Sequence, residues 1–225
     1  MYQIIDRGEV GGGSGGGGAA PRALDYDSLR SSLRKQLANC DGTVKRRLAA
    51  VLFGRPSLKL VQEVLIPNTP YWNVRSGNAI DFYYIGFSSS PQVTFDPDSF
   101  VKTVDRFESE TKWQYMGGTD VLILDAYCDK GQPALDMSHA MAINLEVAVA
   151  NRVILDVPVW VESLIHKAKD AITAHGPGSS GDISDGFGKD LIIDALKHLT
   201  LALLPEGMRA DAEKAFSYVV KDVSK

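Results

Sequence analysis

The amino-acid sequence predicts an α+β fold, in which a small mixed β-sheet is covered by many α-helices. The first observation is the apolar run from Val121 to Leu124 in WQYMGGTDVLILDAY (113–127), which is short and closed by Asp120 and Asp125. Such a run is typical of a central strand buried on both faces. The second observation is the order of patterns along the chain: helices, two or three strands with a helix between them, then a block of helices. An α/β fold is the alternative.

Residues 1–20 differ in composition from the rest of the chain. The stretch GGGSGGGG packs no core and is typical of an engineered Gly/Ser linker, assigned to residues 11–20. The preceding MYQIIDRGEV is no affinity tag that we can identify. We interpret residues 1–10 as a grafted, partner-derived peptide held by the tether, with vector-derived residues as the alternative. Residues 21–225 are expected to form a single domain with an N-terminal helical hairpin and a C-terminal helical block.

Composition and charge exclude several classes of protein. The net charge is −4 and the pI about 5.6, so the chain as a whole lacks the basic character of nucleic-acid-binding proteins. The basic stretch 30–59 is interpreted as a solvated helical face, with an acidic partner as the alternative. No apolar run approaches the roughly 18 residues of a membrane span. Cys40 and Cys128 match no metal-binding spacing, which predicts two free thiols in a reducing cytoplasm.

The N-terminal half is predicted to hold two helices, an ambiguous segment and a strand. Asp27 or Ser28 caps the first helix, and Thr43 caps a shorter one that ends at Gly54. The apolar stripes are Leu29, Leu33, Leu37 and Cys40 in the first helix, and Val44, Leu48, Val51 and Leu52 in the second. The following pattern weakly favours a helix over 57–66, then a loop over 71–78, then a strand over 79–87.

The C-terminal half is predicted to be mainly helical. A helix begins at Asp98 or Ser99 before the central strand, and another covers residues 136–150 after it. Further helices are expected over 161–173, over 187–203 and from Pro205 onwards, with a glycine-rich loop over 174–188.

Two motifs resemble sites of known chemistry but fail on spacing. Gly188 and Lys189 suggest a phosphate-binding loop, but Ile183 stands where its first glycine belongs and Asp190 where it needs serine or threonine. Glu108 and Glu110 match the E-x-E of ADP-ribosyltransferases. However, they lie on a predicted helix, where residues two apart point about 200° from each other. Neither motif supports an enzyme.

An acid cluster provides the one enzymatic hypothesis. Asp136 and His139 are three residues apart on the predicted helix, and Asp120 and Asp125 bound the neighbouring strand. Together they would suit a metal-dependent hydrolase or nuclease. Nothing in the spacing demands it, because each acid also fits a helix start or a strand end. We therefore predict no metal and no cofactor, and a binding protein rather than an enzyme.

The favoured function is that of a cytoplasmic adaptor, a protein–protein interaction module that binds a short peptide of a partner. The ligand is the tethered segment 2–10, and it would contact the module through Tyr2, Ile4, Ile5, Asp6 and Glu9. A small sheet exposes an edge, so we expect strand addition or an apolar groove beside that edge. The predicted peptide-binding residues are Tyr71, Trp72, Arg75, Phe82 and Tyr84.

Overall fold

The structure is a computed structural model that describes residues 24–37, 46–77, 79–88, 94–129, 132–175 and 206–225. The predicted peptide, the linker, the helix over 187–203 and most of the loop over 174–188 lie outside the described residues.

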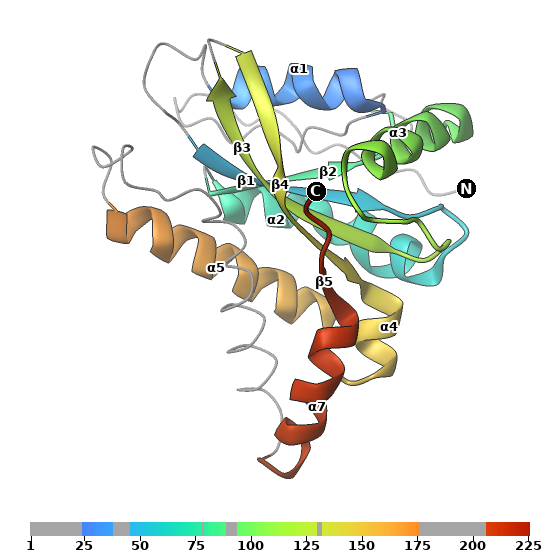
Figure 1. The fold of residues 1–225 in the computed structure, drawn as a ribbon, viewed down its shortest axis with the longest axis vertical. Helices are drawn as coiled ribbons and strands as arrows, with labels where there is room; N and C mark the ends of the chain where they lie inside the picture. Colours follow the sequence, from blue (N-terminus) through green and yellow to red (C-terminus); the bar gives the residue numbers. More distant parts are fainter. Residues whose placement is uncertain (1–23, 38–45, 78, 89–93, 130–131, 176–205) are drawn as a thin grey trace.

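The described part of the chain forms one five-stranded mixed sheet in the order β2-β1-β3-β4-β5 (Figure 1). The strand predicted to be central is the middle one, β3. β1 and β2 are parallel, and every other pair is antiparallel. The α+β fold is confirmed. The strands are β1 (Arg46–Phe53), β2 (Ile80–Tyr84), β3 (Asp120–Asp129), β4 (Gln132–Asn144) and β5 (Val220–Asp222).

The prediction of a helical hairpin was wrong, because β1 stands where its second helix was expected. Leu48 and Phe53 and all four residues between them are buried, because β2 and β3 flank the strand and side-chain layers cover both of its faces. A strand buried on both faces has no polar side, so its apolar residues also match a helical spacing.

β4 likewise replaces most of the helix predicted over 136–150. Only its last part is helical, as α4 (Leu145–Ala150). The pairing of β4 with β3 is interrupted between Ile123 and Asp125, where the register shifts and extra residues of β4 bulge out. This bulge breaks the alternation by which a strand is recognised in a sequence. The predicted helical stripe through Met141 is therefore an artefact of the bulge.

Helices form a layer on each side of the sheet (Figure 1). α1 (Tyr26–Gln36) and α3 (Pro97–Glu110) cover one face, while α2 (Ile66–Ser76) and α5 (Val157–His175) cover the other. α7 (Glu206–Val219) leads into β5. No helix among the described residues is both long and apolar enough to span a membrane.

The caps show why these helices begin where they do. The Asp25 side chain accepts from Ser28 N at 2.8 Å to start α1, and Asp96 accepts from Asp98 N at 3.0 Å to start α3. The helix weakly predicted over 57–66 is confirmed, as a π-helical segment (Val61–Leu65) running into α2. The loop predicted over 71–78 is wrong, because α2 continues to Ser76 with Pro67 near its start and Pro70 inside it, so neither proline ends the helix.

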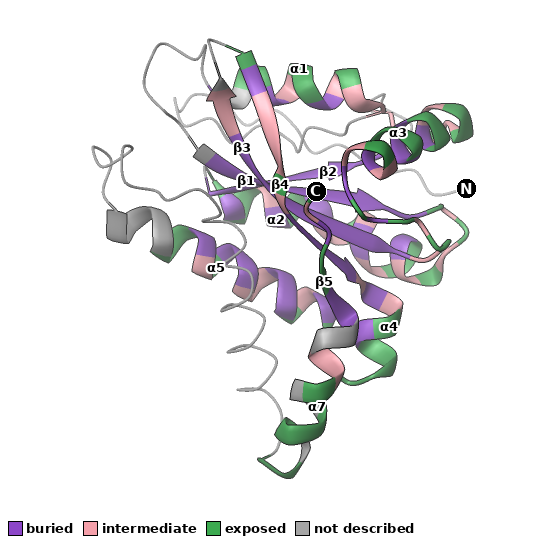
Figure 2. Ribbon diagram, viewed as in Figure 1, coloured by how far each residue is buried: buried purple, intermediate pink, exposed green. Residues whose placement is uncertain are grey.

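Two apolar layers hold the sheet between the helices. In Figure 2, β1, β2 and β3 are buried along most of their length, whereas β4 is buried mainly near its end. On the α1 and α3 side, Phe53 is the centre of an aromatic cluster, with ring centroids 5.2 Å from Phe107 and 4.5 Å from Trp113. Aromatic pairs of this kind contribute beyond their buried area. Trp113 is thereby fixed in place beside the start of β3, where its Nε1 donates to Asp120.

Cys128 is disulfide-bonded, so the prediction of two free thiols was wrong. The chain has one other cysteine, Cys40, which lies outside the described residues. The spacing of cysteines in a sequence can identify a metal site, but it does not show which cysteines form disulfides. The case for a reducing cytoplasm, which depended on free thiols, is lost with it.

Candidate functional site

The candidate site lies at the end of the sheet where β3 begins and β4 ends. Asp120, the first residue of β3, is paired in register with Asn144, the last residue of β4. The segment that follows α3 passes beside them. Lys112 N donates to Val223 O at 2.7 Å, and Val223 N donates to Ala140 O at 2.9 Å. These two bonds hold the segment after α3, the chain after β5 and the edge of β4 together.

A cavity of about 370 Å³ opens between these segments, and we call it the Asp120 pocket. Its size falls within the roughly 300 to 1,000 Å³ of small-ligand sites. Most of the lining is apolar, and two of the apolar side chains, Met116 and Val147, are themselves exposed to solvent. The lining includes Lys112, Trp113, Met116, Asp120, Asn144, Val147, Val219, Lys221 and Val223.

Asp120 is the buried polar group of this pocket, with 4% of its surface exposed. Its carboxylate accepts from Asn144 Nδ2 at 2.6 Å and from Trp113 Nε1 at 3.0 Å. Burial raises the pKa of Asp120, and the bonds from Asn144 and Trp113 oppose that rise. A carboxylate has about four acceptor positions, so two donors among the described residues leave roughly half of its hydrogen-bonding capacity unused.

A second carboxylate, that of Glu146, holds together two of the segments that form the site. Glu146 accepts from Thr119 N at 2.6 Å and from Thr119 Oγ1 at 2.5 Å, which ties the start of α4 to the start of β3. Burial raises the pKa of Tyr115 to about 12. The negative charges of Asp120 and Glu146 add to this rise, and Arg55 opposes it. The inner part of the site is therefore electronegative, whereas its exposed cations, Lys112 and Lys221, face solvent.

Gly118 permits the close approach of Asn144 to the chain. A Cβ atom at Gly118 would lie 2.5 Å from Asn144 Nδ2. We expect Gly118→Ala to push the amide away from Asp120 and to lower the free energy of unfolding by about 1 to 2 kcal/mol, the cost of a disrupted buried hydrogen bond. Urea denaturation measures it. Gly207→Ala is the matched control, because nothing lies within 4 Å of a Cβ there. Equal stability of the two variants would contradict the role of Gly118.

Three of the five residues predicted to bind the peptide are in the core instead. Trp72 is 1% exposed, Phe82 2% and Tyr84 4%, so these rings pack against helix and sheet and form no aromatic surface. Tyr71 is about half exposed. Arg75 Nε donates to Glu162 Oε2 at 3.3 Å, and its guanidinium lies 5.8 Å from the centre of the Tyr71 ring. A role for Tyr71 and Arg75 in binding a partner stays a prediction.

The predicted acid cluster is divided between the two ends of β3. Asp120 lies at one end, whereas Asp125 pairs in register with Asp136 nearer the other. His139 does reach Asp136, with Nδ1 2.7 Å from Oδ2, but on the bulged strand rather than on a helix. The pKa of Asp136 is lowered by its bonds from Ser138 and His139, although burial opposes this. Within the described residues, no group of three or more potential ligands is arranged to hold a metal ion.

The comparisons identify no family. No protein-family model, no curated protein and no solved structure matches this chain. The interpretation of the Asp120 pocket therefore depends on its own geometry.

Most of the pocket residues were not predicted from the sequence. Asp120 was singled out, but as a possible metal ligand, and Trp113 as part of the central stretch. Met116, next to a pair of glycines, carried a usable signal, because a large apolar residue in a loop is often exposed for recognition. Lys221 gave none, because β5 is only three residues long.

Proposed function

We propose that the chain is a protein–protein interaction module that binds a short peptide segment of a partner protein in the Asp120 pocket. The observation that carries the proposal is the position of the pocket beside β5, an edge strand of the described sheet. An edge strand offers backbone hydrogen bonds to an added extended peptide, and a pocket beside it receives the side chains of that peptide. A groove beside an edge was expected, although next to other residues.

The lining favours a peptide that is both apolar and acidic. Met116 and Val147 offer apolar contacts, and the exposed Lys112 and Lys221 offer positive charge to an acid on the peptide. Residues 2–10 begin with the apolar side chains Tyr2, Ile4 and Ile5, and the acids Asp6 and Glu9 follow with the base Arg7 between them. We propose this segment as the tethered ligand.

The tether joins the described chain at Leu24, whose backbone oxygen accepts from Gly86 N at 3.0 Å just after β2. The end of β2 lies at the same end of the sheet as Asp120, although β2 is the edge strand opposite β5. Residues 11–23 are mostly glycine and alanine. A flexible chain of that length spans about 20 Å from end to end. The segment can therefore reach the pocket of its own chain. A short flexible tether of this kind gives an effective concentration in roughly the millimolar range.

We expect the full chain to lose thermal stability when residues 2–10 are shuffled in order. If the effective concentration of the segment exceeds its Kd about 100-fold, binding adds about 2.7 kcal/mol to the free energy of unfolding. Each kcal/mol shifts the melting temperature by about 2 to 4 °C, so calorimetry resolves the loss of binding. Shuffling keeps length and charge constant. Ser14→Gly in the linker is the control and should leave the melting temperature unchanged. An unchanged melting temperature in the shuffled chain would count against residues 2–10 as the ligand.

A further inference from the structure

The Asp120 pocket combines two properties that few side chains satisfy together. Its lining is largely apolar, yet it contains the carboxylate of Asp120, which is almost fully buried and retains acceptor capacity. An aliphatic side chain would fill the volume but would strip water from the carboxylate without replacing its hydrogen bonds, which is unfavourable. The occupant therefore needs an apolar body with a hydrogen-bond donor at its tip.

The positive charges at the pocket distinguish between the side chains that have an apolar body and a donor at the tip. Lysine and arginine have apolar stems and donating tips, but they would enter past the exposed Lys112 and Lys221, both of which line the cavity. Lys221 also partly balances the charge of Asp120 already. Like charges brought together in this way are unfavourable. A neutral donor avoids that repulsion, and the phenol of tyrosine is such a donor.

We propose that the Asp120 pocket selects a tyrosine as the anchor side chain of the bound peptide, with the phenol hydroxyl donating to the Asp120 carboxylate. This inference rests on the function proposed above and adds the class of ligand that the pocket recognises. Residues 2–10 contain one tyrosine, Tyr2.

The spacing of the segment agrees with this anchor. In an extended peptide, alternate side chains point to the same side, so Tyr2, Ile4 and Asp6 share one face. That face carries a ring, an aliphatic side chain and an acid. The pocket has the complement of each: Asp120 for the hydroxyl, Met116 and Val147 for the aliphatic chain, and Lys221 or Lys112 for the acid.

The test uses the full chain with residues 2–10 shuffled and supplies the Tyr2–Val10 peptide in trans. Three peptides are titrated by calorimetry: the natural sequence, Tyr2→Phe and Tyr2→Ala. We expect the Tyr2→Phe peptide to bind about tenfold more weakly, the value of one hydrogen bond to a buried charge, and the Tyr2→Ala peptide more weakly still. The same titrations on Asp120→Asn complete a double-mutant cycle, in which the preference for tyrosine over phenylalanine should fall to about threefold or less.

The location is read from the methyl signals of Val219 and Val223 and from the fluorescence of Trp113, which lines the pocket. Trp72 and Trp160 belong to the apolar cluster on the other face of the sheet. Equal binding of the tyrosine and phenylalanine peptides to the unmodified pocket would overturn the anchor while leaving peptide binding intact. Binding that leaves the valine methyl signals unchanged would overturn the pocket as its location. Binding of none of the three peptides would overturn both proposals.

Discussion

Reduction of the disulfide at Cys128 should lower the free energy of unfolding by about 2 to 5 kcal/mol. The sequence contains one other cysteine, Cys40, which lies outside the described residues. A disulfide removes conformational freedom from the unfolded chain, which typically contributes about 2 to 4 kcal/mol and up to about 5 kcal/mol. The folded state has few new contacts to gain from it. The effect is therefore expected mainly in the unfolded ensemble.

Urea denaturation with and without a reductant measures this difference. Cys128→Ser is the control, because its midpoint should match that of the reduced chain and should not respond to reductant. A midpoint that is the same for the oxidised and reduced chains would show that the bridge contributes nothing to stability.

Arg47→Ala should cost about 3 to 5 kcal/mol, the usual penalty for removing one partner of a buried ion pair. Arg47 Nη2 donates to Asp81 Oδ1 at 2.7 Å and to Gly77 O at 3.3 Å, and both members of the pair are buried. The variant leaves the Asp81 carboxylate buried without its counter-charge. Replacing both residues by Arg47→Met and Asp81→Leu should recover much of the loss, because no charge then stays buried.

The penalty should also depend on pH. Burial raises the pKa of Asp81, and Arg47 opposes that rise, so removing Arg47 raises the pKa further. An acid with a raised folded-state pKa gives its full contribution to stability below its unfolded-state pKa and loses it as pH rises through the folded-state value. The deficit of Arg47→Ala should therefore be smaller at pH 4 than at pH 7, in about the range where a carboxyl titrates. An equal deficit at both pH values would contradict this account.

The strands differ in how far the sequence could predict them. β3 was predicted because a short apolar run between two aspartates has no helical interpretation of comparable quality. β1 was missed because Leu48 to Phe53 is apolar throughout, with Ala49 and Ala50 favouring a helix. β4 was missed because its bulge interrupts the alternation of a regular strand. Where burial or a bulge removes periodicity, the residues alone do not distinguish helix from strand.

The pocket could not be predicted from the sequence for a different reason. It is assembled from segments far apart in the chain, after α3, at the start of β3, at the end of β4 and around β5. A local pattern cannot show which of these segments meet. The tethered peptide, by contrast, was suggested by composition alone, because GGGSGGGG is so unlike the rest of the chain. The link that we propose between the two, a tyrosine that donates to a buried aspartate, could be formulated only once the fold had placed Asp120 in the pocket.

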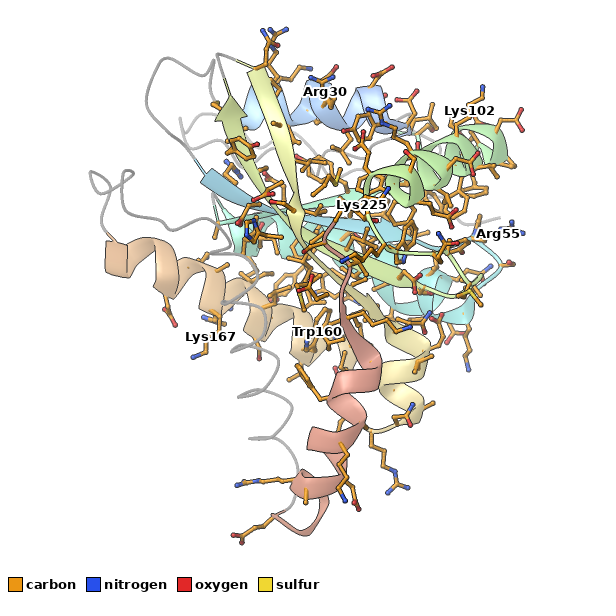
Figure 3. The ribbon with its side chains drawn as sticks, viewed as in Figure 1. Arg30, Arg55, Lys102, Trp160, Lys167 and Lys225 are labelled. Atoms are coloured by element: carbon orange, nitrogen blue, oxygen red, sulfur yellow. The ribbon has the colours of Figure 1, made fainter. Side chains whose placement is uncertain are left out.

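The closure of the pocket by β5 has a consequence for synthesis. The backbone bonds from Lys112 N to Val223 O and from Val223 N to Ala140 O join residues that are far apart in the sequence. Lys225, which is labelled in Figure 3, adds a bond from its Nζ to Ser109 O. While the chain is growing, the segments from α1 to α4 are available to fold before β5 is made. Among the described strands, β5 is the one that covers the outer edge of β4. A chain in which β5 has not yet been made would therefore expose that edge and lack the Asp120 pocket, which β5 helps to line.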